Sequence, residues 1–281
     1  MKIGVYTNLR NDPGCKVARV FTHAALQAGF ECAGQCECDF EAGVTKFGSV
    51  EELTSWADML VVIGGDGTVL NLAAAAARKG VPVLPVHNGS LGFLTEITPS
   101  EIKQAVKFIA EKKYDIEHRS MLETKLNGEV HIALNEILVA RKNRSGICKL
   151  SAYCDGVYFD TYSGDGVIIS TPTGSTGYSL SAGGPVLSPK VKAMILTPLC
   201  VHALNGRAIV FDANEVLTIK VDGKDDFNCM YVDGRQINHD IQVGSAVEIY
   251  KSLCEMKFVR FSEKSFYARM YSKLESWHNR H

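Results

Sequence analysis

A glycine-rich turn contains the residue whose type and position most directly suggest chemistry. The apolar run Met59–Ile63 has the length of a buried strand and leads into Gly-Gly-Asp-Gly-Thr over residues 64–68. Glycines let a ligand approach the backbone, and the free N–H groups of a helix start attract phosphate. Asp66 places a carboxylate in this anion-binding turn, although like charges repel. Its position favours accepting a proton from, or orienting, a hydroxyl that attacks a phosphoryl group; the alternative is a helix cap.

The turn differs from the two commonest nucleotide-binding motifs. No lysine follows it, as the P-loop pattern GxxxxGK[ST] requires, and its glycines do not have the GxGxxG spacing. An ordinary Rossmann dehydrogenase is therefore disfavoured.

A second glycine pair follows the next apolar run. Val81–Val86 reads as a strand, and Asn-Gly-Ser-Leu-Gly-Phe-Leu continues from residue 88 to residue 94. Open α/β sheets bind ligands at the carboxyl ends of their strands, so close backbone approach is expected here too. Phe93 either faces the ligand or belongs to the core.

Asn135 and Glu136 interrupt the apolar run Ile132–Val139. Consecutive strand residues face opposite sides, so at least one of these polar groups points into protein and needs a partner there. The alternative is that they mark a strand end at the surface. The basic residues that follow either form a solvated loop or neutralise phosphates: Arg141, Lys142, Arg144 and Lys149.

The segment from Gly164 to Pro185 is dense in glycine and hydroxyl side chains and flanks a predicted strand. Such a segment offers many N–H and hydroxyl donors with little side-chain bulk, which suits a polar, phosphorylated ligand. Asp165 is its only acidic residue. A purely structural loop is the alternative.

Strand and helix patterns alternate over the first ~115 residues, which predicts a parallel sheet covered by helices. Helix starts are indicated by Asp12-Pro13, by capping boxes at Ser49–Glu52 and Thr98–Glu101, and by the alanine-rich run Thr68–Lys79, whose end is marked by Gly80. Lys2–Thr7 reads as the first strand.

Short β-type runs separated by Asn-Gly and Asp-Gly turns replace this pattern after about residue 117. The sequence therefore predicts an α/β N-terminal domain with a parallel sheet over 1–117 and a mainly-β C-terminal domain over 118–258. Residues 259–281 are expected to return to the first domain, with a helical segment from Ser265 to His281.

Composition excludes several classes of protein. The chain has 281 residues, with 30 Lys and Arg against 31 Asp and Glu, so nothing drives it generally toward nucleic acid or an anionic membrane. We expect neither a transmembrane helix nor a signal peptide. The nine cysteines lack any CxxC pair and are expected to be free thiols in a reducing cytoplasm. A metal site at Cys32, Cys36 and Cys38 would need partners that the sequence does not identify.

Taken together, these motifs resemble the NAD kinases in order and approximate spacing. The resemblance runs almost end to end and includes Leu196–His202, Asp233-Gly234 and the stretch Tyr267–Trp277. Diacylglycerol kinases, sphingosine kinases and phosphofructokinases share only the first motif, whereas Asn135-Glu136 with Asp165–Pro185 is far more specific.

The resemblance implies transfer of the terminal phosphate of ATP to the adenosine ribose 2′-hydroxyl of NAD, giving NADP, with Mg²⁺ or Mn²⁺. It also implies a homotetramer. From the cysteines and the net charge we expect a cytoplasmic protein that binds neither nucleic acid nor membrane. Asp66 matches the catalytic proton acceptor, and no metal ligands are identified. The implied substrate-binding residues are Gly67, Phe93, Asn135, Glu136, Ser163, Asp165, Thr176, Gly177, Tyr178, Ser179, Leu180, Ser181 and Gln236.

Three positions depart from the family pattern. Asn71 stands where many members carry a basic residue, Ser163 where an arginine is frequent, and Val201 where a proline is frequent. These departures bear on how phosphates are neutralised and on the choice between NAD and NADH. Two other functions stay open at this point. A lipid kinase would more plausibly show a membrane-docking face, and a non-catalytic dinucleotide sensor would not need Asp66.

Overall fold

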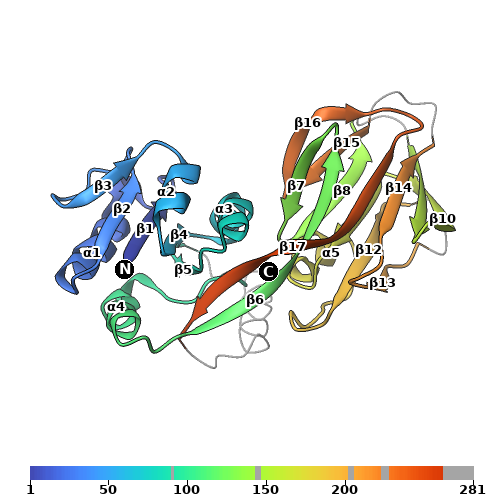
Figure 1. Cartoon of the computed structure of the whole chain (residues 1–281). Helices are drawn as coiled ribbons and strands as arrows, with labels where there is room; N and C mark the ends of the chain where they lie inside the picture. The colour runs from blue at the N-terminus through green and yellow to red at the C-terminus, as the bar shows by residue number, and fades with distance from the viewer. Residues whose placement is uncertain (90–91, 143–146, 202–205, 223–227, 262–281) are drawn as a thin grey trace, which may run out of the picture. The chain divides into compact units, whose positions relative to one another are not determined.

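The computed structural model describes residues 1–89, 92–142, 147–201, 206–222 and 228–261. The chain divides into two compact units (Figure 1). Unit 1 comprises Met1–His118 and Glu255–His281, and unit 2 comprises Arg119–Cys254. The predicted helical segment Ser265–His281 lies outside the described residues.

Unit 1 is built on a parallel sheet in the strand order β3-β2-β1-β4-β5. Strand β17 adds to this sheet beside β5, where Phe258 pairs in parallel with Val83. The predicted strand and helix alternation is thereby confirmed. The strands are β1 (Lys2–Thr7), β2 (Glu31–Gln35), β3 (Val44–Phe47), β4 (Met59–Gly64) and β5 (Val83–His87).

Helices connect these strands, and the apolar faces of α1 and α4 pack on the sheet around Phe21, Ile63 and Ile102. They are α1 (Lys16–Gln27), α2 (Val50–Trp56), α3 (Asp66–Lys79) and α4 (Ile102–Ala110), with short 3₁₀ turns η1 (Pro13–Cys15) and η2 (Pro99–Glu101). None of the helices within the described ranges is both long and apolar enough to cross a membrane.

Two helix starts differ from the prediction. The helix expected at Asp12-Pro13 begins only at Lys16, because Gly14 and Cys15 adopt positive φ angles of 69° and 54°. The Asp12 carboxylate nonetheless accepts hydrogen bonds from the first-turn amides of Val17 and Ala18, at 2.9 and 3.1 Å. Helix α3 begins at Asp66, two residues before the expected Thr68, which places the carboxylate on the first helical residue.

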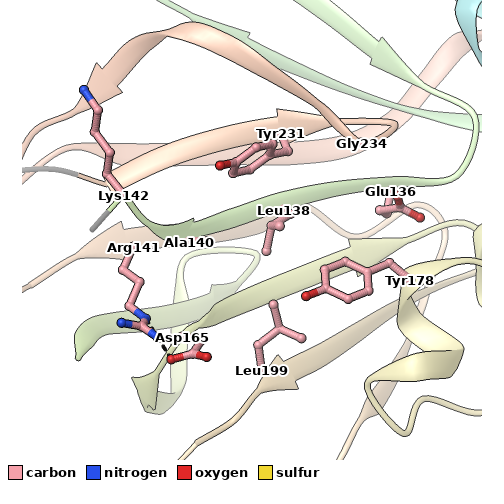
Figure 2. A pocket seen from close by; sticks show the side chains of 10 residues that line it. All are labelled: Glu136, Leu138, Ala140, Arg141, Lys142, Asp165, Tyr178, Leu199, Tyr231 and Gly234. Atoms are coloured by element: carbon pink, nitrogen blue, oxygen red, sulfur yellow. Dashed lines mark ion pairs between the residues drawn. The ribbon is translucent and has the colours of Figure 1, made fainter. Parts of the chain in front are cut away.

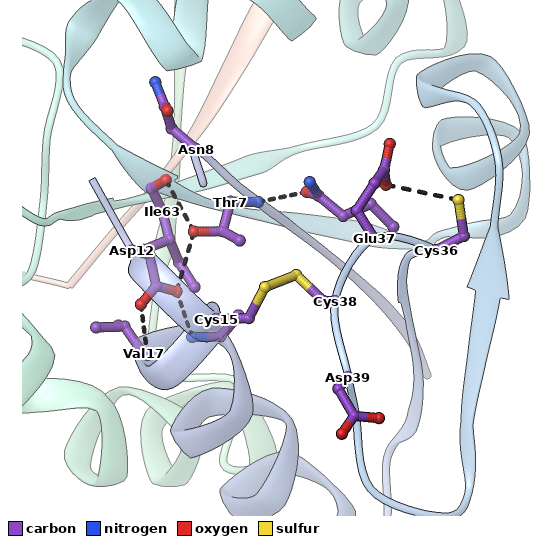
Figure 3. Close-up of a disulfide and its surroundings, with 12 residues drawn as sticks. Thr7, Asn8, Asp12, Cys15, Val17, Cys36, Glu37, Cys38, Asp39 and Ile63 are labelled. Atoms are coloured by element: carbon purple, nitrogen blue, oxygen red, sulfur yellow. Dashed lines mark hydrogen bonds between the residues drawn. A yellow bond between two sulfur atoms is a disulfide. The ribbon is translucent and has the colours of Figure 1, made fainter. Parts of the chain in front are cut away.

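The expectation of nine free thiols is wrong for one pair. Cys15 and Cys38 form a buried disulfide that joins the turn before α1 to the turn after β2 (Figure 3). The other seven cysteines are free. Because Cys38 is bonded to Cys15, the cluster of Cys32, Cys36 and Cys38 does not act as a metal site. No local sequence pattern pairs these two residues; only the folded approach of two loops does.

Reduction of this disulfide is expected to lower the free energy of unfolding by about 3 kcal/mol. The bond joins residues 23 positions apart, and a crosslink across a loop of that size restricts the unfolded chain. Urea denaturation with and without a thiol reductant measures the difference. Cys15→Ser should remove the response to reductant, whereas Cys36→Ser, which replaces an exposed free thiol, should keep it. Identical wild-type midpoints in both buffers would contradict the prediction.

Unit 2 consists of two antiparallel sheets, which confirms the predicted mainly-β domain. One has the order β10-β9-β14-β17, with β6 pairing β17 and β7; the other has the order β13-β12-β11-β8-β15-β16. Between them lies an apolar core that includes Leu150, Val167 and Ile219. The strands are β6 (Asp115–Leu126), β7 (Glu129–Ala133), β8 (Glu136–Arg141), β9 (Cys148–Cys154), β10 (Val157–Gly164), β11 (Gly166–Ser170), β12 (Ala193–Leu199), β13 (Ile209–Asp212), β14 (Leu217–Val221), β15 (Asn228–Val232), β16 (Arg235–Ile241) and β17 (Ala246–Arg260).

Candidate active site

The Asp66 carboxylate in unit 1 is held in place by two backbone amides. Its Oδ2 accepts a hydrogen bond from the N–H of Phe93 at 2.8 Å, and its Oδ1 accepts one from Leu94 at 3.1 Å. Each carboxylate oxygen can accept more than one hydrogen bond, so acceptor capacity remains for a substrate hydroxyl. The two glycine motifs found in the sequence therefore form one site, in which the second motif orients the carboxylate of the first.

Glycine is required where these motifs approach each other. A Cβ on Gly92 would collide with Asp66 Oδ1, and a Cβ on Gly64 would collide with the Thr68 side chain. Gly65 and Gly67 face open space, so their lack of a side chain leaves the turn accessible to a ligand. The glycines of the first motif thus have two different roles, packing and access.

The end of β1 supports the same turn. The Asn8 amide donates to the carbonyl of Ile63 at 3.1 Å, and its side-chain Nδ2 donates to Thr68 Oγ1 at 3.4 Å. Asn8 therefore connects β1 to both β4 and α3 beside Asp66. No sequence pattern indicates this role for Asn8, because the contacts span about 60 residues.

A buried carboxylate in unit 2 organises the segment around Asn135. Asp233 accepts hydrogen bonds from three consecutive amides, those of Leu134, Asn135 and Glu136, at 2.8, 2.7 and 3.2 Å. These amides would pair with a neighbouring strand if the run Ile132–Val139 were continuous. The predicted single run is therefore divided into β7 and β8, with Asn135 in the break.

The glycine- and hydroxyl-rich segment also holds Asn135, through its backbone carbonyl. Thr171 donates its amide to the Asn135 carbonyl at 2.9 Å and its hydroxyl to the Leu134 carbonyl at 2.6 Å. A Cβ on Gly174 would strike the Asn135 carbonyl, and one on Gly177 would lie 3.0 Å from Glu136 Oε2. The glycine- and hydroxyl-rich segment therefore packs directly against the Asn-Glu pair.

Glu136 is a titratable group that this arrangement perturbs strongly. Burial, with a smaller contribution from the negative charge of Asp233, raises its pKa from 4.5 to about 7, although an amide hydrogen bond from Tyr178 opposes the shift. Burial likewise raises the pKa of Asp233, against the lowering effect of its three amide donors. Near neutral pH the Glu136 carboxyl is thus able to donate or accept a proton at a ligand hydroxyl or amide.

The raised pKa of Glu136 makes stability depend on pH. Between pH 4.5 and 7 the folded protein keeps a proton that the unfolded chain has released, so stability falls as pH rises. Glu136→Gln has no carboxyl proton to lose. As pH rises through this range, its free energy of unfolding should therefore increase relative to that of the wild type, by up to about 3 kcal/mol. Urea unfolding at pH 5 and pH 8 without substrates measures the difference. Parallel pH dependences for the two proteins would show that Glu136 is ionised throughout.

A pocket of about 390 Å³ opens beside Glu136 in unit 2. Figure 2 shows the aromatic rings of Tyr178 and Tyr231 with Leu138 and Leu199 on its walls, and the carboxylates of Glu136 and Asp165 at separate points. Its lining consists of Glu136, Leu138, Ala140, Arg141, Lys142, Asp165, Tyr178, Leu199, Tyr231 and Gly234. An apolar pocket with a few convergent polar groups is typical of a site for an aromatic ring that carries polar substituents.

Both basic residues on the wall of this pocket are paired with carboxylates. Arg141 Nε lies 2.8 Å from Asp165 Oδ1, and Lys142 Nζ lies 2.8 Å from Asp240 Oδ2. The sequence left open whether this basic stretch is a solvated loop or neutralises phosphates. In the structure the two side chains border the pocket, where a ligand anion would compete with Asp165 and Asp240 for them.

The remaining predicted substrate-binding residues have varied surroundings. Thr176 and Gly177 lie at η3 (Gly174–Thr176), and Tyr178, Ser179, Leu180 and Ser181 form α5 (Tyr178–Ser181). Ser179 is fully buried, and its hydroxyl lies 2.8 Å from that of Thr197. Ser163 is partly buried on β10, and Gln236 is exposed on β16.

Several residues of the pocket and its support were not among the sequence predictions. Leu138 and Leu199 are ordinary apolar strand residues, and Tyr231 carries no motif, so nothing distinguished them from core residues. Asp233 had a signal, since it belongs to an Asp-Gly turn, but that signal indicated only the turn. The hydrogen bonds by which Asp233 holds residues 134–136 join positions that are nearly 100 residues apart in the sequence.

Models of known protein families match most of the chain. Residues 22–114 match the model of the ATP-NAD kinase N-terminal domain, and residues 134–261 match that of the ATP-NAD kinase C-terminal domain. The NAD kinase of Caldanaerobacter subterraneus subsp. tengcongensis is 36% identical over 97% of this chain and 98% of its own length. The NAD kinase of Acetivibrio thermocellus is 33% identical over 98% of this chain and 97% of its own length.

Solved structures share the fold. A yeast NADH kinase complexed with NADH superposes with a TM-score of 0.85 at 23% identity, covering 98% of this chain and 87% of that one. An Archaeoglobus fulgidus NAD kinase in complex with ATP superposes with a TM-score of 0.79 at 24% identity, covering 98% of this chain and 99% of that one. The two-domain architecture is therefore that of the NAD kinases.

The carboxylate in a glycine turn, the Asn-Glu pair and the adjoining pocket thus occur in a chain that matches NAD kinases along nearly its whole length. A lipid kinase that shares only the first glycine motif does not account for that extent of similarity. The chain belongs to the ATP-NAD kinase family, and its activity is the ATP-dependent phosphorylation of NAD to NADP.

Proposed function

We propose that Asp66 accepts the proton of the adenosine ribose 2′-hydroxyl of NAD as that oxygen attacks the terminal phosphorus of ATP. A bond forms between the 2′-oxygen and phosphorus, the bond from phosphorus to the β,γ-bridging oxygen breaks, and ADP leaves with the electron pair. The observation that carries this proposal is the carboxylate fixed by the amides of Phe93 and Leu94 at the start of α3. A held carboxylate suits general-base catalysis, in which geometry comes before acidity.

We further propose that unit 2 supplies the dinucleotide site. Tyr178 and Tyr231 provide ring faces for a base, while Glu136 provides a polar contact at the edge of the pocket. Asn135, with its backbone fixed by Asp233 and Thr171, presents a side-chain amide beside Glu136, and these two residues would hold ribose or amide groups of NAD. The other implied contact residues, from Thr176 to Ser181, lie on the neighbouring η3 and α5.

The carboxylate in the glycine turn fits a divalent cation that is carried by ATP. Mg²⁺ usually keeps several waters and is bound by one or two carboxylates together with substrate phosphates, where it neutralises their charge. Asp66 offers one carboxylate in the glycine turn. Among the described residues, the cluster of Cys154, Asp155 and Glu215 suits such an ion poorly, because burial and nearby acids raise the pKa of the Cys154 thiol to about 11. We propose Mg²⁺ or Mn²⁺ as the cofactor on this basis.

Analogues of NAD test which hydroxyl is phosphorylated. With ATP and Mg²⁺, an analogue that lacks the adenosine ribose 2′-hydroxyl should bind but yield no phosphorylated product. An analogue that lacks the nicotinamide ribose 2′-hydroxyl is the matched control and should still be phosphorylated. Product formation from the first analogue would overturn the assignment of the acceptor oxygen.

We propose that the enzyme is a homotetramer. The apolar strands β8 and β14 are interior, each paired on both sides. Exposed apolar residues instead lie on the edge strands β10 and β13: Val157, Tyr158, Ile209 and Val210. The aromatic ring of Phe159 on β10 packs against that of Phe211 on β13, with ring centroids 5.3 Å apart. Exposed apolar sheet edges are usually covered.

Light scattering at micromolar concentration is expected to give the mass of four chains. Tyr158→Lys together with Val210→Lys should reduce that mass, because each places a charge on the exposed apolar edge. Ile147→Lys, which changes an apolar residue that is also exposed but lies on neither edge strand, is the control. A wild-type mass near that of one chain, with full kinase activity, would reject the assembly.

We also propose a cytoplasmic location. Seven of the nine cysteines are free thiols, as is usual in a reducing compartment, and one pair forms the Cys15–Cys38 bond. No nucleic acid or membrane partner is proposed, since the net charge of −1 provides no general attraction to either.

A further inference from the structure

We propose that Arg260, the last residue of β17, is a positioning residue for the Asp66 carboxylate. It holds the segment Phe93–Glu96, and the amides of that segment orient Asp66. This inference rests on the proposed role of Asp66 as proton acceptor. It assigns a function in the phosphoryl-transfer step to the strand by which the chain returns to unit 1.

The guanidinium of Arg260 binds the segment at two points. Its Nη1 donates to the carbonyl oxygen of Leu94 at 3.0 Å and to Glu96 Oε2, also at 3.0 Å. Leu94 therefore donates its N–H to Asp66 while its C=O accepts from Arg260. One residue connects the two side chains directly, with no intervening loop.

The contact between Arg260 and Glu96 is buried and charge-compensated. Only 7% of the Arg260 side chain and 2% of the Glu96 side chain are exposed. The other carboxylate oxygen of Glu96 accepts the amide of Phe261 at 3.0 Å. On the far side of the guanidinium, Nε donates to Glu117 at 2.7 Å. Arg260 Nη2 is buried and has no hydrogen-bond partner among the described residues. The ion pair still fixes geometry closely, because a displacement would leave a buried charge without a partner.

The segment that carries the two amides needs such support because it follows an obligatory glycine. Gly92 must remain glycine because a Cβ there would collide with Asp66, and glycine gives the backbone its greatest freedom. Beyond Leu94, the segment is held to β5 by Glu96 N–H to the Pro85 carbonyl at 2.9 Å. Arg260 thus acts at Leu94, one of the residues between Gly92 and this first anchor to the sheet.

The matched substitution is Arg260→Lys. Lysine keeps the charge but has no planar fork able to bind Leu94, Glu96 and Glu117 together. We expect kcat to fall about 10–100-fold, because displacement of a catalytic group by about 1 Å costs rate on that scale. KM for NAD should stay within about threefold, since the proposed dinucleotide contacts belong to unit 2. Glu96→Gln should reproduce the loss of kcat and serves as the readout if Arg260→Lys fails to fold.

Lys257→Met is the control on the same strand. Lys257 Nζ contacts the Gly80 carbonyl at 3.4 Å, at the opposite end of α3 from Asp66. This variant also removes a contact between β17 and the rest of unit 1, but it leaves the segment Phe93–Glu96 untouched. It should keep wild-type kcat and so separate a positioning effect from a general loosening of the strand.

A double-mutant cycle with Asp66→Asn tests whether Arg260 acts on kcat through Asp66. If Arg260 acts through Asp66, Arg260→Lys should cause no further loss of kcat in the Asp66→Asn background. Equal losses in both backgrounds, or wild-type kcat in both Arg260→Lys and Glu96→Gln, would overturn the inference while leaving the role of Asp66 intact. Wild-type turnover of Asp66→Asn alone would instead reject the proposed role of Asp66.

Discussion

Replacement of Asp66 by asparagine is expected to lower kcat about 10²–10⁴-fold while NAD still binds with nearly wild-type affinity. Loss of a general base typically costs a factor of that size. Binding persists because the proposed dinucleotide contacts lie on other residues, among them Asn135 and Glu136. Steady-state kinetics gives kcat, and calorimetric titration gives the affinity for NAD.

The geometry at Asp66 demands a check on folding for this variant. Both carboxylate oxygens accept backbone amides, so an asparagine NH₂ group would turn a donor toward the N–H of Phe93 or Leu94. Thermal unfolding therefore accompanies the kinetics. Asp58→Asn is the matched control, since Asp58 is an exposed aspartate just before β4 whose carboxylate accepts the Lys2 amide at 2.8 Å. Near wild-type turnover of a folded Asp66→Asn would exclude a general-base role.

Alanine at Asn135 or at Glu136 is expected to weaken NAD binding about 5–150-fold. Removal of one partner from a buried polar contact costs about 1–3 kcal/mol, which corresponds to that range of affinities. The backbone at this point is fixed by Asp233 and Thr171, so the fold should survive the loss of either side chain.

Calorimetric titration with NAD measures both variants against Asn214→Ala, which truncates an exposed asparagine beside Asp212 at the far end of β13. The control should keep wild-type affinity. Unchanged affinity in both the Asn135→Ala and the Glu136→Ala proteins would leave Asn135 and Glu136 as structural residues at a strand break.

Sequence patterns predicted the elements whose signals are local. The apolar runs of β4 and β5, the glycines after them and the capping boxes before α2 and α4 each depend on residues within one turn or strand. The same reasoning identified Asp66 and the Asn135-Glu136 pair, because polar residues in apolar or glycine-rich surroundings are unusual. The resemblance to NAD kinases then supplied the substrate, which no local pattern specifies.

Long-range contacts account for what the sequence did not reveal. Asp233 divides the run Ile132–Val139 by accepting amides almost 100 residues away, and Arg260 reaches Leu94 across 166 positions. Cys15 meets Cys38 only because two loops of unit 1 adjoin. Such partners share no periodicity or motif, so one sequence contains no local signal that would join them.

Direct detection of the product tests whether NAD is the phosphoryl acceptor of this enzyme. The wild-type protein is incubated with ATP, Mg²⁺ and NAD, ADP is quantified, and NADP is read by an NADP-specific dehydrogenase, which responds only to the 2′-phosphorylated dinucleotide. We predict one NADP for each ADP formed, with neither product accumulating when NAD is omitted. Formation of ADP without NADP, or an ADP yield independent of NAD, would contradict the assignment of NAD as the phosphoryl acceptor.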